Sequence, residues 1–186
     1  MKPWKQVAKE PLADARVFTV ARERALSPRT GLECDFYVLN TPDWVNVVPV
    51  TPEGDLVLVR QYRQGIHDVT LEIPGGTMDP DDSGPLEAAR RELLEETGYE
   101  AERLVSLGWV HPNPALQDTR CHTFLAQGAR RVAEPSPDGS EDLEVVLVPL
   151  AKAPELISKG EITHSLVLCA FAWAFGLRPP EPAQGG

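Results

Sequence analysis

Apolar and polar residues alternate through much of this chain, which is the pattern of β-strands with one buried face. Residues 15–26 and 34–40 show this pattern on either side of a turn-forming run, Ser-Pro-Arg-Thr-Gly, at positions 27–31. The spacing predicts an antiparallel β-hairpin near the N-terminus. Residues 1–12 carry Trp4 among mixed charges, and we assign no element to them.

A second group of strands is predicted in the middle of the chain. Residues 44–50 and 55–63 are joined by another turn-forming run, Thr-Pro-Glu-Gly. The four consecutive apolar residues 56–59 favour a central position in a sheet for the second strand. Further strands are expected at 68–73, 104–110, 120–126 and 145–150, and helices at 153–159 and from 163 or 164 to 177.

Residues 85–97 have the periodicity of an amphipathic helix. Pro85 suits a first helical position and Gly98 is a common helix stop. An apolar stripe along this helix is formed by Leu86, Ala89 and Leu93. A neighbouring arc of roughly 100° holds three carboxylates, those of Glu92, Glu95 and Glu96.

Glu92 and Glu96 repel each other at this i,i+4 spacing, at a cost of about 0.2–0.5 kcal/mol. A divalent cation would turn the repulsion into attraction, because Mg²⁺ prefers oxygen ligands such as clustered carboxylates. The alternative is an ordinary solvated helix, in which Arg91 pairs with Glu87 or Glu95. The helix taken by itself favours this alternative.

The loop before the helix, residues 75–84, changes that preference because loop and helix together resemble the Nudix box. The box has the pattern G-x5-E-x7-R-E-U-x-E-E-x-G-U, where U is a bulky apolar residue. The first glutamate is replaced here by Asp82, and eight residues rather than seven separate Asp82 from Arg91. The matching positions are Gly76, Arg91, Glu92, Leu93, Glu95, Glu96 and Gly98, with Tyr99 at the last U. The departures put the geometry of the loop in question and leave the metal-ligand positions in place.

The resemblance implies an α/β fold, the Nudix α/β/α sandwich with a mixed sheet, with the N-terminal antiparallel hairpin added to it. It also implies a hydrolase that depends on Mg²⁺, with Mn²⁺ as a substitute. The implied metal ligands are the carbonyl oxygen of Gly75 and the carboxylates of Glu92, Glu95 and Glu96. Arg91 would orient these glutamates.

One further acid is implied by similar enzymes, in which a carboxylate from a later loop closes over the metals. Residues 129–144 hold two prolines, a glycine and several acids, and should form a mobile loop. Glu141 is the implied residue. Its role as a metal ligand or as the base for water stays open, and a solvated acidic loop is the alternative.

A narrower resemblance covers residues 57–63 and 71–76. The runs VLVRQYR and LEIPGG are similar to those of ADP-ribose and nucleoside-diphosphate-sugar pyrophosphatases within the Nudix group. This similarity implies cleavage of a pyrophosphate bond to give a nucleoside monophosphate and a sugar phosphate. It places Arg63 near the substrate phosphates and Glu72 close to the site. Ordinary surface ion pairs are an equal alternative for both residues.

Residues 111–118 form a polar loop with two prolines, which suits a stiff recognition loop. His111 and Asn113 are its candidates for substrate contact, although a lone loop histidine is more often simply exposed. Two other classes of function remain open. One is a Nudix fold used as a ligand-binding or regulatory module, which would be expected to lack a helix glutamate. The other is an enzyme acting on another nucleotide, such as a dinucleotide or a capped RNA.

Charge narrows these classes. The 186 residues include 28 acidic and 18 basic side chains, for a formal net charge of −10. This balance argues against nucleic-acid binding by a broad basic surface, and it is compatible with a small nucleoside diphosphate only if local arginines and metal ions offset the negative charge. The three cysteines form no metal-binding or disulfide pattern. With no signal peptide and no apolar run of about 18–20 residues, we expect no membrane association and a cytoplasmic location.

The chain is expected to have one catalytic domain with extensions at both ends. Residues 1–42 form the N-terminal β region, which in the similar subfamily exchanges contacts between two subunits, so a homodimer is implied. Residues 43–178 form the Nudix domain. Residues 179–186 are a polar, proline-rich tail that we expect to be flexible.

Overall fold

The computed structural model describes residues 1–136, 139 and 142–176, which fall into two compact units. Unit 1 combines the N-terminal segment Met1–Asp43 with the later segment His111–Arg120. Unit 2 contains Trp44–Val110 and the chain from Cys121 onward. The predicted tail at 179–186 lies outside the described residues.

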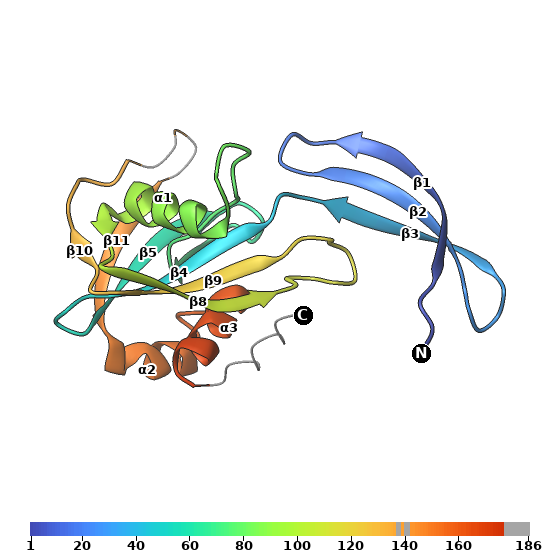
Figure 1. Cartoon of the computed structure of the whole chain (residues 1–186). Helices are drawn as coiled ribbons and strands as arrows, with labels where there is room; N and C mark the ends of the chain where they lie inside the picture. The colour runs from blue at the N-terminus through green and yellow to red at the C-terminus, as the bar shows by residue number, and fades with distance from the viewer. Residues whose placement is uncertain (137–138, 140–141, 177–186) are drawn as a thin grey trace, which may run out of the picture. The chain divides into compact units, whose positions relative to one another are not determined.

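Unit 1 is built on a three-stranded antiparallel sheet in the order β1-β2-β3 (Figure 1). The strands are β1 (Lys5–Asp14), β2 (Thr19–Leu26) and β3 (Glu33–Asn40). The predicted hairpin is confirmed as β2 and β3, which pair from Thr19 opposite Asn40 to Leu26 opposite Glu33. Strand β1 was not predicted because all ten of its residues are exposed, so no buried face imposes alternation on its sequence.

The loop 111–120 attaches to this N-terminal sheet through main-chain and side-chain hydrogen bonds. The N–H of Leu39 donates to the carbonyl of Leu116 at 2.7 Å, and the hydroxyl of Thr119 donates to the carbonyl of Pro42 at 2.7 Å. The backbone N–H of Arg120 donates to the carboxylate of Asp43 at 2.8 Å. Unit 1 is therefore formed by segments that are far apart in the sequence.

Unit 2 is organised around a six-stranded mixed sheet in the order β11-β5-β4-β9-β8, with β6 paired to β5. Its strands β4 and β9 are parallel, and the other pairs are antiparallel. A separate short pair joins β7 (Tyr99–Glu100) to β10 (Arg130–Arg131). The strands of the large sheet are β4 (Trp44–Val50), β5 (Asp55–Arg63), β6 (Asp68–Glu72), β8 (Arg103–Val110), β9 (Cys121–Gln127) and β11 (Leu143–Pro149).

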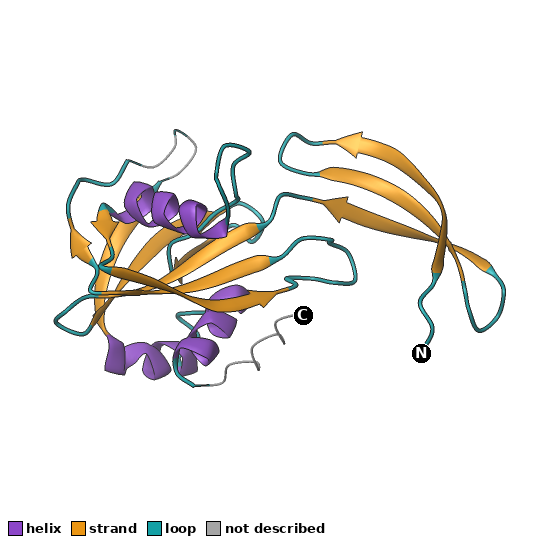
Figure 2. Cartoon of the chain, in the orientation of Figure 1, coloured by secondary structure: helices purple, strands orange, loops and turns teal. Residues whose placement is uncertain are grey.

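Helices cover both faces of this sheet (Figure 2). Helix α1 (Pro85–Thr97) lies on one face. A 3₁₀ turn at Leu150–Lys152, α2 (Ala153–Ser158) and α3 (Ser165–Ala174) lie on the other. None of the helices within the described ranges has the length and apolar character needed to cross a bilayer.

Side chains of β4 pack in two separate hydrophobic cores, one on each face of the sheet, as expected for a strand whose side chains point to opposite faces. Val45 and Val47 belong to the core that includes Leu93 of α1. Val48 belongs to the core that includes Phe171 of α3. The predicted α/β/α sandwich with a mixed sheet is confirmed.

Candidate active site

Helix α1 has the predicted bounds, because its ends are marked by local signals. Pro85 occupies the first turn, and Gly98 caps the C-terminal end in the left-handed conformation, with φ of 72°. The N–H of Gly98 donates to the carbonyl of Leu94 at 2.8 Å. A side chain at position 98 would also meet the carbonyl oxygen of Ala133 at 2.2 Å. Both the backbone conformation and this close approach therefore require glycine.

Two of the helix glutamates are turned toward the glycine pair at 75–76. Glu96, 2% exposed, accepts a hydrogen bond from the N–H of Gly75 at 2.8 Å. Glu92, 8% exposed, lies so close to Gly76 that an added Cβ would meet its Oε1 at 2.6 Å. The side chain of Glu95 is 46% exposed. The structure thus brings Glu92 and Glu96 together with the glycine loop and leaves Glu95 nearer to solvent.

Arg91 connects these glutamates to the loop. Its Nη1 donates to Glu92 at 2.9 Å and to Glu95 at 3.1 Å. Its Nη2 donates to the carbonyl of Thr77 at 3.1 Å and to Asp82 at 3.0 Å, and its Nε donates to Asp82 at 3.2 Å. The Asp82 carboxylate is the main reason that the pKa of Arg91 is raised. These contacts fit the predicted role of Arg91 in orienting glutamates.

Asp82 shows how the loop accommodates its departures from the Nudix pattern. Both oxygens of the carboxylate accept hydrogen bonds from Arg91, and one also accepts a hydrogen bond from the N–H of Asp79 at 2.7 Å. The hydrogen bond from Arg91 lowers the pKa of Asp82. Although the side chain is shorter than glutamate and the loop is one residue longer, Asp82 still ties the loop to α1.

We predict that Asp82→Asn lowers the free energy of unfolding by about 1 kcal/mol at pH 7, a magnitude reduced by solvent screening. Because the pKa of Asp82 is lowered in the folded state, its contribution is complete above the unfolded pKa of about 3.9 and is lost as pH falls through the folded value. Urea unfolding of both proteins at pH 7 and at pH 3 measures this difference. A difference that stays the same at both pH values would contradict the assignment.

Arg63 and Glu72 form a second charged arrangement, at the ends of β5 and β6. Arg63 donates to Glu72 through Nε at 2.9 Å and through Nη2 at 2.7 Å, and Thr70 adds its hydroxyl at 2.5 Å. Glu72 is 2% exposed. Burial pushes the pKa of Glu72 upward, but the bonds from Arg63 and Thr70 outweigh it and the net shift is downward. Glu72 is thus a buried, ionised carboxylate rather than a member of a surface ion pair.

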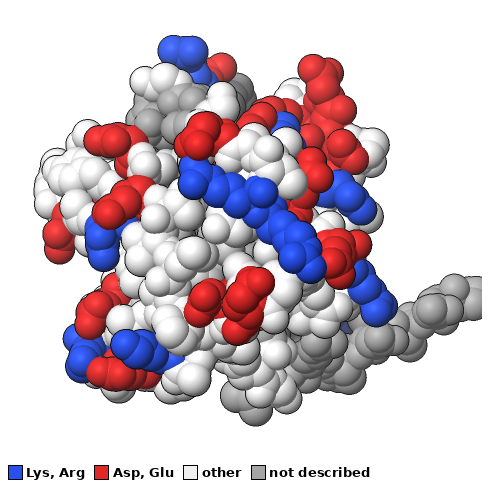
Figure 3. Space-filling view, turned by 90° about the vertical axis from the view of Figure 1, so that its left-hand side faces the viewer, with Lys and Arg blue, Asp and Glu red and all other residues white. Residues whose placement is uncertain are grey.

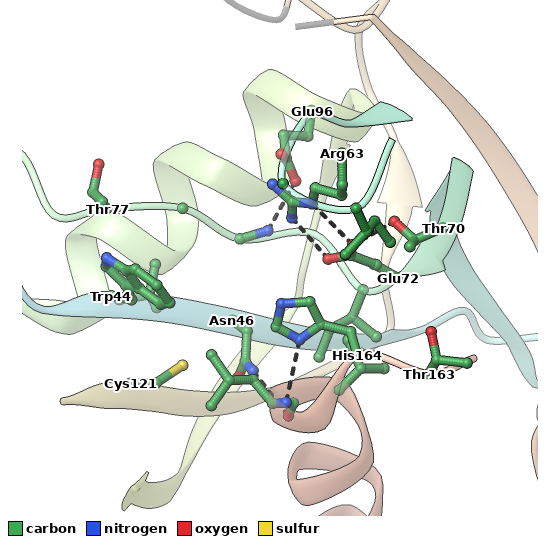
Figure 4. A pocket seen from close by; sticks show the side chains of 18 residues that line it. Trp44, Asn46, Arg63, Thr70, Glu72, Thr77, Glu96, Cys121, Thr163 and His164 are labelled. Carbon is green, nitrogen blue, oxygen red and sulfur yellow. Dashed lines mark hydrogen bonds and ion pairs between the residues drawn. The ribbon is translucent and has the colours of Figure 1, made fainter. Parts of the chain in front are cut away.

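A cavity of about 590 Å³ joins these two arrangements within unit 2 (Figure 4). Glu96 and the glycine pair come from the loop and helix side, and Arg63 and Glu72 come from the strand ends. The rest of the wall comes from β4, β6, β9, the turn between β5 and β6, the segment after β6 and the start of α3. These further lining residues are Trp44, Val45, Asn46, Gly65, Ile66, Thr70, Ile73, Thr77, Cys121, Thr163, His164, Leu166 and Val167.

Among the polar side chains of this cavity that were not predicted from the sequence are those of Trp44, Asn46 and His164. Asn46 gives the one available signal, since it is a polar residue inside the apolar strand WVNVVPV. Trp44 lines the cavity because of how β4 pairs in the sheet, and His164 because of where α3 packs. Sequence periodicity predicts neither of these long-range arrangements.

Three predicted site residues are not among the residues that the structure describes in unit 2. His111 and Asn113 belong to unit 1, where Nδ1 of His111 lies 3.1 Å from the carbonyl oxygen of Thr119. Glu141 lies outside the described residues. The structure therefore groups Arg63, Glu72 and the residues of the glycine loop and α1 in one unit.

The donor chemistry of the glycine loop suits a hard divalent cation. Glu92 and Glu96 present carboxylate oxygens beside the backbone of Gly75 and Gly76, and oxygen is the ligand that Mg²⁺ prefers. Among the residues described, no group of three or more acidic, His or Cys side chains is already arranged around one metal position. The argument for a divalent cation therefore rests on two buried carboxylates and the backbone of the loop. Glu95 is the most exposed of the three candidate carboxylate ligands.

Comparison with known proteins finds a family match and several similar proteins. The NUDIX domain model matches residues 41–171. An ADP-ribose pyrophosphatase of Bacillus subtilis (strain 168) is 31% identical, over 85% of this chain and 85% of the relative. An ADP-ribose pyrophosphatase of Mycobacterium tuberculosis (strain ATCC 25618 / H37Rv) is 28% identical, over 95% of this chain and 87% of the relative.

A solved structure described as an ADP compounds hydrolase shares the fold. Its TM-score is 0.83 at 24% sequence identity, and the superposition covers 95% of each chain. The family match extends over most of the sequence and includes both the glycine loop and helix α1. This chain is a member of the Nudix hydrolase family.

Proposed function

We propose that this Nudix hydrolase cleaves the pyrophosphate bond of ADP-ribose or of another nucleoside-diphosphate sugar, giving a nucleoside monophosphate and a sugar phosphate. The observation that carries the proposal is that two charged side chains from different elements line one cavity. They are Glu96 of α1 and Arg63 at the end of β5. A diphosphate has the charge to use both, through Arg63 directly and through metal at the helix carboxylates.

The residues have separate roles in this proposal. Arg63, oriented by Glu72, holds a phosphate oxygen, and Arg91 holds the helix carboxylates in place. Mg²⁺, or Mn²⁺ in its place, would be held by Gly75 O together with Glu92, Glu95, Glu96 and Glu141. When bound, such a metal offsets the charge of the diphosphate and lowers the pKa of an attacking water. For Glu141 the proposal covers two roles, that of a metal ligand and that of the base that activates the attacking water.

A small substrate suits the surface charge better than a nucleic acid does. On the face drawn in Figure 3, basic side chains have acidic ones beside them. Some of the basic side chains form ion pairs with acidic side chains of the same chain, as in Arg130–Glu102 and Arg131–Glu134. A chain with net charge −10 is therefore proposed to act on small nucleotides in the cytoplasm rather than on a polyanion or at a membrane.

We also propose that residues 1–42 mediate a homodimer and that residues 43–178 are the catalytic domain. Supporting this, the sheet of unit 1 exposes several apolar side chains, among them Val7, Leu12 and Tyr37. Trp4 and Phe36 pack edge to face, with ring centroids 5.3 Å apart, while remaining partly exposed. A second subunit would cover this apolar surface. The aromatic residues of the surface are candidates for holding the nucleotide base of the substrate.

The test is hydrolysis of a panel of compounds, followed as phosphate released by a coupled phosphatase, with Mg²⁺ and with a chelator. We expect ADP-ribose or several nucleoside-diphosphate sugars to be cleaved with Mg²⁺ and none with the chelator. Cleavage of ADP-ribose alone would identify a dedicated enzyme, and cleavage of several sugars a broad one. Turnover only of dinucleotides or capped RNA, or binding without any turnover, would overturn the proposal.

A further inference from the structure

Two buried polar atoms on strand β4 lack hydrogen-bond partners among the described residues. They are Nε1 of Trp44, a donor, and Oδ1 of Asn46, an acceptor. Both side chains line the cavity, and Figure 4 shows them on the same strand. Positions 44 and 46 point to the same face of β4, about 7 Å apart along the strand. Because buried polar groups are nearly always paired, this pair requires an explanation.

The orientation of the Asn46 amide follows from its neighbour. Its Nδ2 lies 3.3 Å from the carbonyl oxygen of Leu166 in the first turn of α3. A carbonyl oxygen can only accept, so the NH₂ group must face Leu166 and the Oδ1 atom must face away from it. Asn46 is 6% exposed. The acceptor is therefore held in place inside the unit rather than free to turn toward solvent.

His164 adds a donor at the same cavity. Its Nδ1 accepts the N–H of Leu166 at 3.2 Å and so caps the N-terminus of α3. A neutral histidine whose Nδ1 accepts a hydrogen bond carries its proton on Nε2. The ring is labelled among the lining side chains in Figure 4. The wall formed by β4 and α3 thus combines donors with an acceptor.

This mixture selects a chemical class of ligand. A phosphate group has only acceptor oxygens at its exposed positions and would be repelled by Oδ1 of Asn46. A purely apolar group would leave both polar atoms unsatisfied. A hydroxyl can donate to Asn46 and also accept from an N–H such as that of Trp44, and a sugar carries several hydroxyls pointing in different directions. The surrounding Ile66, Ile73 and Val167 provide apolar surface for the carbon skeleton.

We infer that Asn46 and Trp44 form a sugar-recognising subsite, which binds hydroxyl groups of the sugar attached to the diphosphate. The inference rests on the proposed function, since the diphosphate must occupy the Arg63 and Glu96 end of the same cavity. Asn46 and Trp44 then determine which substrates are used. They take no part in cleavage of the bond.

The experiment compares two substrates, ADP-ribose and the methyl ester of ADP, which has the same pyrophosphate bond but no sugar on the distal phosphate. Asn46→Val removes the acceptor in a residue suited to a strand, and Trp44→Phe keeps an aromatic ring while removing the donor. Each is expected to lower kcat/KM for ADP-ribose about 10-fold or more, the range for an unpaired hydrogen-bonding group, and to leave the ester nearly unchanged.

The matched control is Thr123→Val. Thr123 is the register partner of Asn46 on β9 and is 1% exposed, but it is outside the set of lining residues. The ratio of kcat/KM for the two substrates should stay at the native value in this variant. Melting temperatures establish that all three variants fold.

Three outcomes separate the possibilities. A selective loss with ADP-ribose in both Asn46→Val and Trp44→Phe supports the subsite. Equal losses on both substrates would show that Asn46 only holds α3 in place, and would overturn the inference while leaving the proposed function intact. If the native protein cleaves neither compound, the proposed function fails and the inference fails with it.

Discussion

Replacing Glu96 with Gln is expected to lower kcat for ADP-ribose about 10³-fold, corresponding to about 4 kcal/mol of lost transition-state stabilisation at a metal site. Glutamine has nearly the same shape, and its carbonyl oxygen can still accept the N–H of Gly75 that now donates to Glu96 at 2.8 Å. The loop should therefore stay in place while the negative charge is lost. Steady-state kinetics across a Mg²⁺ titration measures the effect.

Glu87→Gln is the matched control for this variant. Glu87 is an exposed acid in the first turn of the same helix, so the change removes one charge from α1 without touching the glycine loop. We expect its kcat to remain within about twofold of the native value, as for a surface change away from the site. Full Mg²⁺-dependent turnover by Glu96→Gln would show that Glu96 is not a metal ligand.

Arg63→Ala should reduce both stability and activity. It leaves the carboxylate of Glu72, whose side chain is 3% exposed, with Thr70 but without its cationic partner. An unpaired buried charge costs several kcal/mol, and we expect about 2–3 kcal/mol here because Arg63 itself is 42% exposed. Loss of the proposed contact between Arg63 and a substrate phosphate should also lower kcat/KM about 100-fold. Urea unfolding and steady-state kinetics measure the two effects.

Arg60→Ala controls for the loss of an arginine from β5. Arg60 pairs with Glu144, and both side chains are well exposed, so the change should cost less than about 1 kcal/mol. The double variant Arg63→Ala/Glu72→Leu removes the buried charge as well and should recover much of the stability but none of the activity. Native-like stability of Arg63→Ala alone would show that Glu72 does not depend on Arg63.

The sequence predicted well those features that local chemistry determines. Helix α1 begins at Pro85 and ends before Gly98 as expected, because each end carries its own signal. Of its predicted apolar stripe, Ala89 and Leu93 are buried, but the prediction was wrong for Leu86, which is 45% exposed in the first turn of the helix. Glu92 and Glu96 were expected on one side because they are one turn apart. The sandwich was also predictable, but through resemblance to a family rather than through periodicity.

Features that depend on long-range packing were not predictable. Strand β1 has no buried face to reveal it, and the exposure of its ten residues left only mixed composition to interpret. The attachment of residues 111–120 to the N-terminal sheet depends on single contacts such as Leu39 to Leu116. His164 reaches the cavity because α3 packs on the sheet. Of Trp44, Asn46 and His164, only Asn46 has a visible sign in the sequence, as a polar residue in an apolar strand.

The parallel pairing of β4 with β9 has a consequence for how the protein folds. Trp44 pairs with Cys121, and β5 pairs with β11, so each of the two central strands obtains one of its partners from the second half of the chain. Long loops must close before these contacts form, which slows folding relative to a protein with mainly local contacts. During synthesis, β4 and β5 emerge before β9 and β11, so their apolar residues have no complete sheet to join. The central sheet is completed only after β11 has left the ribosome.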